Sequence, residues 1–325
     1  MQKHFAGSCG LVTALDSHSN EITARDKLRF SGKVISKQLF SYDLLFFDHL
    51  GLARVQTLVP ASLRRPYGVF LHAIEAWGEL DRSGLRALTE AKVRVAPSGF
   101  SAERIAAAHP EAGEIDVCHL ALGRNPEIPR GNFDAAVIDR MHRESILIVG
   151  RIMKSEAYKG HDQLISAWPL VRQQVPTAQL VIVGRGDDIG RLKSLAQQLG
   201  VGDAVLLLGP VDEATLHAIY GRVAAFAMPS RAEGFGVVYL EAMSHRLPCI
   251  GSIHDGAREI IVDGETGFLV HQDDTDALAA KITLLLADPA LRERMGVNGF
   301  ERWRNCFSFE QFERRMLQIF QKLKD

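Results

Sequence analysis

Short apolar runs, most of them ended by glycine or proline, recur through the second half of this 325-residue chain. Helical patterns of apolar residues lie between most of these runs, which occupy positions 146–149, 180–183, 205–208, 224–228 and 248–251. Runs that are apolar at every position, rather than at alternate positions, indicate strands that are buried on both faces. Such strands with helices between them predict a parallel sheet covered on both sides, which is a doubly wound α/β domain.

The first half of the chain shows the same order less regularly. Its short apolar runs predict a second, smaller α/β unit and lie at 44–47, 68–71, 92–96 and 115–120. A cluster of polar residues at 139–144 separates the halves, so we expect one domain over residues 1–140 and another over 141–325. Apolar residues at helical spacing between 309 and 323 predict a terminal helix in the second domain.

Composition is ordinary for a soluble globular protein, since 46% of the residues are hydrophobic and 24% are charged. The formal net charge of −1 gives no support for a nucleic-acid partner. The four cysteines lie far apart and form no C-x-x-C pair, so neither a structural zinc site nor a disulfide framework is predicted. This pattern favours a reducing compartment.

No stretch approaches the roughly 18–20 apolar residues of a membrane span, and the first residues lack the apolar core of a signal peptide. We therefore expect a cytoplasmic protein. Basic residues gather in the first domain, at positions 27, 29, 33, 37, 64 and 65. They allow peripheral contact with the cytoplasmic face of a membrane, although a solvated basic face is the simpler interpretation.

The run from Glu233 to Glu241 carries the strongest chemical signal. A Gly-Phe-Gly loop stands between the two glutamates and opens into the start of an apolar helix. The first turn of a helix has free N–H groups and the positive end of the helix dipole, which together bind phosphate. Carboxylates on either side of a phosphate would accept hydrogen bonds from hydroxyl pairs, which a nucleotide sugar offers. Taken alone, the run fits an ordinary loop-to-helix junction with two solvated glutamates equally well.

This run resembles the E-x7-E motif of the GT4 family of retaining glycosyltransferases, which have the GT-B fold. Further segments match the family in the same order, at 149–151, 158–160, 181–186, 208–211, 229–230 and 263–270. The resemblance covers about residues 145–320. It implies an α/β protein of two Rossmann-like doubly wound domains facing a cleft, with an N-terminal acceptor-binding domain and a C-terminal domain that binds the nucleotide-sugar donor.

The resemblance also implies roles for single residues. Arg151 and Lys159 match the pair that grips the donor diphosphate, where fixed cations stabilise the charge that develops on the leaving phosphate. Two cations in this place make a divalent metal unnecessary, so no metal and no other cofactor is expected. Glu233 would face the transferred sugar and Glu241 the ribose hydroxyls.

The remaining candidates of the donor site come from the loops that follow the predicted strands. Backbone N–H groups near Val237 and Val238 would hold phosphate, together with the loop Gly234, Phe235 and Gly236. Val211 matches the position where the base is read, and Arg185 either contacts the donor or caps the preceding strand. In the first domain, His72 follows an apolar run and would lie near the sugar and the acceptor. The expected catalytic set is therefore Glu233, His72, Arg151 and Lys159.

Two features require a separate interpretation. Asp274-Thr275-Asp276 spells a D-x-D, which binds a metal in other transferases, but it precedes a helix and is better explained as a cap. Family members begin with a strand and a Gly-rich loop, whereas this chain has Gly7-Ser8-Cys9-Gly10 with almost nothing before it. We therefore expect an abbreviated N-terminal domain.

The expected function is retaining transfer of a hexose from a nucleotide diphosphate sugar to a hydroxyl acceptor. A UDP-sugar is favoured, with GDP-mannose next, and the acceptor is a glycan, a lipid-linked glycan or a small molecule in exopolysaccharide or cell-surface glycan synthesis. A GT-B epimerase or phosphorylase is a second reading, which the E-x7-E run disfavours. A third is a catalytically impaired, nucleotide-sugar-binding partner subunit, which the short N-terminus suggests.

Overall fold

The computed structural model describes residues 24–123 and 133–324, and these form two compact units. The first unit comprises residues 24–97, 101–118 and 316–324. The second comprises Ser98–Phe100 and His119–Arg315, apart from the stretch that the structure does not describe. The predicted pair of parallel-sheet α/β units is confirmed.

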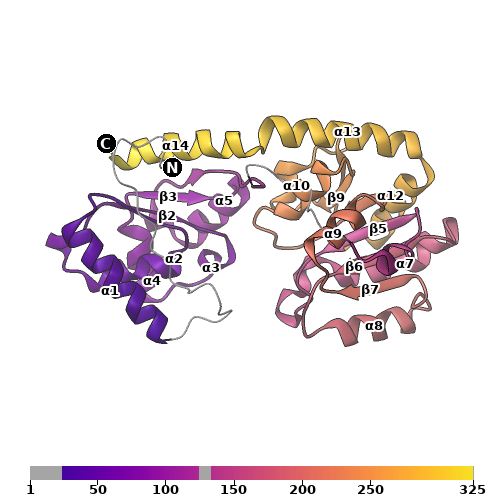
Figure 1. Cartoon of the computed structure of the whole chain (residues 1–325), viewed down its shortest axis with the longest axis horizontal. Helices are drawn as coiled ribbons and strands as arrows, with labels where there is room; N and C mark the ends of the chain where they lie inside the picture. The colour runs from indigo at the N-terminus through magenta and orange to yellow at the C-terminus, as the bar shows by residue number, and fades with distance from the viewer. Residues whose placement is uncertain (1–23, 124–132, 325) are drawn as a thin grey trace. The chain divides into compact units, whose positions relative to one another are not determined.

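The second unit is built on a six-stranded parallel sheet with the strand order β10-β9-β8-β5-β6-β7 (Figure 1). Its strands are β5 (Ser145–Val149), β6 (Gln179–Val183), β7 (Val205–Gly209), β8 (Ala225–Ala227), β9 (Cys249–Ser252) and β10 (Gly267–Val270). The five apolar runs of the sequence are β5 to β9. The order reverses between β5 and β8, the kind of switch point at which doubly wound sheets bind ligands.

Helices cover this sheet and explain why its strands are apolar throughout. They are α6 (Ala135–Ile138), η4 (Lys154–Lys159), α7 (His161–Gln174), α8 (Ile189–Gln198), α9 (Glu213–Tyr220), α10 (Val237–Ser244), α11 (Ala257–Ile260), α12 (Thr275–Ala287) and α13 (Pro289–Cys306). α12 packs beside α7, and α13 packs against α10 (Figure 1). Ile146, Leu147 and Ile148 of β5 are fully buried, because β5 lies inside the sheet with side chains packed on both faces.

The first unit has a four-stranded parallel sheet in the order β1-β2-β3-β4. Its strands are β1 (Leu45–Phe47), β2 (Tyr67–Phe70), β3 (Val93–Ala96) and β4 (Asp116–Val117). Its helical segments are α1 (Ala24–Phe40), α2 (Leu50–Ala53), η1 (Arg54–Leu58), η2 (Ala61–Leu63), α3 (Ile74–Trp77), α4 (Arg82–Thr89), α5 (Gly99–Ala108) and η3 (Pro110–Ala112). The smaller α/β unit predicted for the first half is therefore present.

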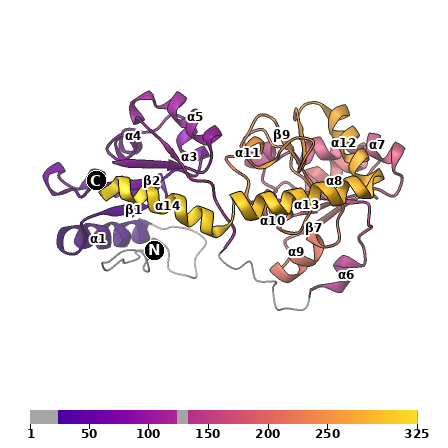
Figure 2. The same ribbon diagram turned by 90° about the horizontal axis from the view of Figure 1, so that it is seen from above.

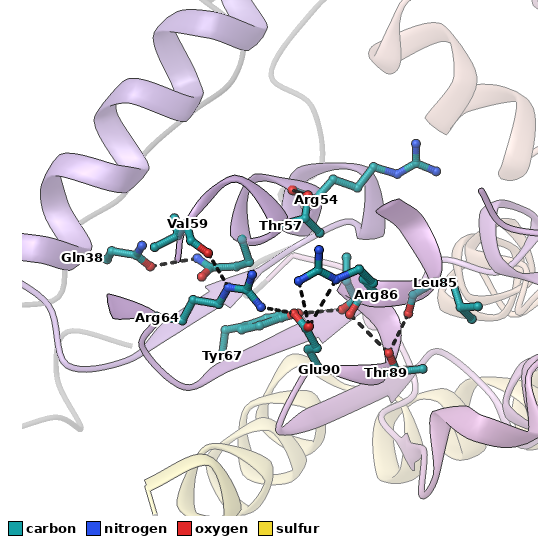
Figure 3. A network of polar contacts seen from close by, with 12 residues as sticks. Gln38, Arg54, Thr57, Val59, Arg64, Tyr67, Leu85, Arg86, Thr89 and Glu90 are labelled. Atoms are coloured by element: carbon teal, nitrogen blue, oxygen red, sulfur yellow. Dashed lines mark hydrogen bonds and ion pairs between the residues drawn. The ribbon is translucent and has the colours of Figure 1, made fainter. Parts of the chain in front are cut away.

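A polar network ties the helices of the first unit together (Figure 3). The buried amide of Gln56 in η1 donates to the side-chain oxygen of Gln38 in α1 over 3.0 Å. Arg64 and Arg86 both pair with Glu90 at the end of α4. The Gln56–Gln38 bond is buried, whereas the pairs with Glu90 lie partly in solvent and join the segment after η2 to the end of α4.

The division into units differs from the predicted boundary at 140/141. The described residues from 119 to 140 belong to the second unit, and the end of α14 (Phe309–Lys324) belongs to the first (Figure 2). The ring of Phe320 packs edge-on against Phe46 of β1, with 4.9 Å between centroids, and Lys322 pairs with Asp116 of β4. The terminal helix was predicted to belong to the second domain, but the side chains at its end pack against strands of the first unit.

Two further expectations concern the ends of the chain and membranes. The Gly7–Gly10 segment lies outside the described residues. Among the helices that the structure describes, none is long and apolar enough to cross a membrane.

Candidate functional site

The predicted donor-site residues of the second unit lie on loops that follow its parallel strands. Arg151 follows β5, Arg185 follows β6, Val211 follows β7 and Glu233 follows β8. Parallel strands end at one edge of a sheet, so all four loops share the carboxyl edge, where open α/β sheets bind ligands.

Charged side chains form a chain of ion pairs at this edge. Lys159 Nζ lies 3.1 Å from Glu233 Oε2 and 3.9 Å from Glu156 Oε2. Arg151 Nη2 lies 2.6 Å from Glu156 Oε1. The Lys159 side chain is only 14% exposed, whereas that of Arg151 is 69% exposed. The structure thus brings Arg151, Lys159 and Glu233 together, and it adds Glu156, which the sequence interpretation missed.

A close approach of two backbones fixes the position of Lys159. Gly160, which follows η4, has φ +91°, and a Cβ atom there would lie 2.6 Å from the carbonyl oxygen of Pro229. The N–H of Arg231 donates to the carbonyl of Tyr158 over 2.9 Å. These two contacts involve Tyr158 and Gly160, the residues on either side of Lys159. They therefore hold Lys159 next to the loop that carries Glu233.

The loop after Glu233 leads directly into α10. Gly236 has φ +90°, and a Cβ atom there would meet the ring of Tyr239 at 2.6 Å, so glycine is required at this turn. Val237 and Val238 form the first turn of α10, whose N–H groups are not used within the helix. The ring of Phe235 is buried and stacks on His119 at 5.6 Å. Phe235 therefore anchors the loop with its side chain, and only its backbone can face a donor.

The two less specific candidates are also placed at the carboxyl edge. The Arg185 side chain is exposed, and its carbonyl accepts the N–H of Ile152 over 2.9 Å, which joins the loops after β5 and β6. Val211 is half-buried against the core of the second unit. The donor contacts of Arg185 and Val211 stay predictions.

His72 lies in the first unit, at the end of β2. Its Nε2 is 2.7 Å from the carbonyl oxygen and 3.4 Å from the Oδ1 of Asp48, and this partner raises the pKa of His72. The next residue, Ala73, has φ +118°, a strained conformation for a residue with a Cβ atom. Backbone strain of this kind clusters at ligand sites, which supports a functional role for His72. Its approach to the sugar stays a prediction.

Comparison with known proteins agrees with this geometry. Residues 134–302, more than half of the chain, match the model of the family described as "Glycosyl transferases group 1". The chain belongs to this family. The second unit is thus the part that the family model matches, and the ion pairs at its carboxyl edge lie within the matched residues.

Similar proteins cover parts of the chain. A GDP-mannose-dependent alpha-(1-6)-phosphatidylinositol monomannoside mannosyltransferase of Mycolicibacterium smegmatis is 38% identical over 148 residues, which are 43% of this chain and 39% of that protein. The capsular polysaccharide biosynthesis glycosyltransferase CapM of Staphylococcus aureus is 34% identical over 161 residues, which are 49% of this chain and 41% of CapM. The matches thus span less than half the length of these two relatives.

Solved structures share the fold of the glycosyl transferases of group 1. Sucrose-phosphate synthase of Thermosynechococcus elongatus matches with a TM-score of 0.75 at 24% identity, covering 93% of this chain and 80% of that one. HepE of Anabaena in complex with UDP matches with a TM-score of 0.72 at 20% identity, covering 90% of this chain and 82% of HepE. At these identities the similarity shows the GT-B fold alone.

The D-x-D segment caps a helix in this glycosyl transferase group 1 chain. The Asp274 carboxylate accepts the N–H of Ala277 over 2.8 Å at the start of α12. The predicted capping interpretation is confirmed. Among the described residues, no group of three His, Cys, Asp or Glu side chains could hold a metal ion. Catalysis without a metal stays a prediction.

The sequence did not indicate the buried carboxyl group that contacts the backbone of Glu233. Asp255, on the loop after β9, is 0% exposed and accepts the N–H of Ala257 over 2.9 Å and that of Glu233 over 3.4 Å. The N–H of Gly256 donates in turn to the Glu233 carbonyl over 2.9 Å. Burial raises the pKa of Asp255 to about 7, with the negative charge of Glu233 contributing in the same direction. Asp255 therefore positions the backbone of Glu233.

We expect Asp255→Asn to flatten the pH dependence of stability. The carboxyl of Asp255 has a pKa of about 7 in the folded protein and about 3.9 in an unfolded chain, so between these values the folded state holds a proton that the unfolded state releases. The free energy of unfolding therefore falls as the pH rises through this window, by up to about 1.4 kcal/mol per pH unit, and this fall ends above about pH 7. Asparagine keeps an acceptor for Ala257 but does not titrate.

Urea unfolding of both proteins, from about pH 5 to pH 8, measures this difference, because contributions from all other groups cancel between wild type and variant. The difference in unfolding free energy should shift in favour of Asp255→Asn as the pH rises. Parallel pH profiles would show that Asp255 ionises normally.

Proposed function

We propose that this chain is a retaining glycosyltransferase that moves a hexosyl group from a nucleotide diphosphate sugar to a hydroxyl acceptor. The observation that carries the proposal is the row of ion pairs Arg151–Glu156–Lys159–Glu233 next to the first turn of α10. Cations beside a helix N-terminus suit a diphosphate, and a carboxylate paired with one of these cations suits the hydroxyl groups of a sugar.

The chemistry follows from where charge develops. The bond between the sugar C1 and the diphosphate oxygen breaks, and negative charge grows on the leaving phosphate. Lys159, Arg151 and the first N–H groups of α10 stabilise that charge. The acceptor oxygen forms its bond to C1 on the face that the phosphate leaves, and its proton passes to a leaving phosphate oxygen. Glu233 orients the sugar, and Glu156 keeps the two cations in place.

The names of the more similar relatives support one donor class. The mannosyltransferases, which are 34–38% identical to this chain, are named for GDP-mannose, whereas the UDP-bound HepE structure is only 20% identical and supports the fold alone. Although the sequence analysis favoured a UDP-sugar, GDP-mannose is now the first donor to test and a UDP-sugar the second.

The acceptor that we propose is a hydroxyl group of a lipid-linked or polysaccharide intermediate in cell-surface glycan synthesis. The names of the mycobacterial relatives and of CapM, which refer to a phosphatidylinositol mannoside and a capsular polysaccharide, support this class. The basic residues of the first unit would then contact the membrane that carries such an acceptor. No metal takes part in this proposal, because Arg151 and Lys159 supply the positive charge.

Titration calorimetry with GDP and UDP, each with magnesium and with EDTA, tests the donor site. We expect one nucleotide to bind with a micromolar dissociation constant that magnesium leaves unchanged. Radiolabelled transfer from the matching sugar nucleotide, or its hydrolysis, then tests turnover. A chain that binds neither nucleotide would contradict the proposal, and binding without transfer or hydrolysis in the presence of lipid extracts would favour a nucleotide-sugar-binding subunit.

A further inference from the structure

A buried tyrosine holds the second glutamate of the E-x7-E run. The hydroxyl of Tyr220, the last residue of α9, donates to Glu241 Oε2 of α10 over 2.8 Å. Within residues 24–123 and 133–324, no lysine, arginine or histidine forms an ion pair with Glu241, and Tyr220 is the side chain that hydrogen-bonds to its carboxylate. The orientation of this carboxylate therefore depends on Tyr220.

The two groups remain donor and acceptor because of their surroundings. Tyr220 is only 2% exposed, and its pKa is raised well above 10 by burial and by the negative charge of Glu241, so the hydroxyl keeps its proton. Burial also raises the pKa of Glu241, and the hydrogen bond from Tyr220 opposes that rise. A carboxylate has two oxygens with about four acceptor positions. The bond from Tyr220 to Oε2 leaves Oε1 available to accept from a ligand.

Aromatic packing fixes the ring of Tyr220. His245, which follows α10, stacks on this ring with 4.9 Å between centroids and 22° between planes. His217 of α9 meets His245 edge-on at 4.3 Å. The Nδ1 of His245 lies 2.9 Å from the Glu241 carbonyl oxygen, which anchors the imidazole to the same turn of α10. The Tyr220 ring therefore cannot swing away from Glu241 without breaking this stack.

We propose that Tyr220 is a positioning residue, which orients the Glu241 carboxylate so that its free oxygen accepts a hydrogen bond from the 2′-hydroxyl of the donor ribose. The inference rests on the proposed function and extends it, because it makes discrimination between ribose and 2′-deoxyribose depend on a residue outside the E-x7-E run. Without the tyrosine hydroxyl, the Glu241 carboxylate loses its fixed direction, and the ribose contact weakens.

The test compares GDP with 2′-deoxy-GDP by titration calorimetry on the full chain, or UDP with 2′-deoxy-UDP if UDP is the nucleotide that binds. We expect the wild type to bind the ribonucleotide about tenfold more tightly than its 2′-deoxy form, the equivalent of one good hydrogen bond to a charged group. In Tyr220→Phe, ribonucleotide affinity should fall about tenfold while 2′-deoxynucleotide affinity stays within about twofold. The preference for ribose is then lost.

Tyr239→Phe is the matched control. Tyr239 is a second buried tyrosine of the same unit, but its hydroxyl donates to the Met228 carbonyl over 2.6 Å and not to Glu241. This variant loses an equally buried hydroxyl and should keep the wild-type preference for ribose. A general loosening of the unit would weaken the binding of both nucleotides in either variant, and this result for Tyr220→Phe would overturn the inference.

Further outcomes separate the inference from the function on which it rests. A wild type that binds neither nucleotide overturns both, whereas a wild type that binds the two forms equally overturns the inference and leaves the donor site standing. An unchanged ribose preference in Tyr220→Phe also overturns it. In turnover assays, Tyr220→Phe should raise the KM for the donor with kcat within about twofold. Added to Glu241→Gln, it should have no further effect, since the two residues act through one contact.

Discussion

Replacing Lys159 by alanine is expected to lower the rate of glycosyl transfer by about 10²–10³-fold, the usual loss when one fixed group that stabilises transition-state charge is removed. Lys159 Nζ is 3.1 Å from Glu233 and is mostly shielded from water, so its charge acts at short range and little solvent screens it. Its loss also leaves Glu233 without this cation. We therefore expect kcat to fall more than donor affinity, which steady-state kinetics with the donor identified by calorimetry measures.

Lys154→Ala is the control for this substitution. Lys154 begins the same 3-10 helix η4 as Lys159, but its side chain is exposed. Its removal changes the net charge by the same amount and should leave the transfer rate within about twofold, since exposed charges are screened. Thermal melts of both variants check that the fold persists. Equal losses in the two variants would mean that the general field of the unit, and not the placed Lys159 cation, assists the reaction.

Gly184→Ala is expected to destabilise the second unit by more than about 4 kcal/mol, a loss that marks a backbone clash and not a surface change. Gly184 follows β6 with φ +155°, and a Cβ atom there would lie 1.8 Å from the carbonyl oxygen of Gly150 after β5. The Gly184 N–H also donates to the Gly209 carbonyl at the end of β7 over 3.0 Å. One methyl group would thus push apart three strand ends at the carboxyl edge.

Gly190→Ala, six residues later, separates this clash from a general effect of losing glycine. Gly190 lies in α8, and a Cβ atom there would have no neighbour within 4 Å. Alanine favours the helix, so we expect this variant to be more stable by up to about 1 kcal/mol. Urea unfolding of both variants gives the two free energies. A Gly184→Ala protein as stable as the wild type would show that the strand ends separate easily.

The sequence predicted those parts of the molecule that depend on local pattern. Apolar runs at every position identified strands β5 to β9, because burial on both faces leaves no place for polar side chains. Asp274 was recognised as a cap because a cap is defined by its distance from the helix that follows. Arg151, Lys159 and Glu233 were grouped by a family resemblance, and the structure places them along one chain of contacts.

Residues whose roles depend on packing were missed. Asp255 and Tyr220 act on the two glutamates of the E-x7-E run from other loops and helices, and no spacing in the sequence connects them with it. Glu156 stands between Arg151 and Lys159 in the sequence, and in the folded chain its carboxylate pairs with both cations. The end of α14 was assigned to the wrong unit because an apolar stripe shows that a helix is covered but not which unit covers it.

Because the end of the last helix belongs to the first unit, the two units cannot finish folding in the order in which the ribosome makes them. Lys322 pairs with Asp116, which is 206 residues earlier, and Phe320 covers Phe46, which is earlier still. At about 5–20 residues per second, a ribosome needs about 10–40 s to make the 206 residues between Asp116 and its partner. During that time the N-terminal half has left the exit tunnel with the apolar edge around Phe46 uncovered, while the second unit becomes complete. The half that is made first therefore finishes folding last, because the helix end that completes it is made at the end of synthesis.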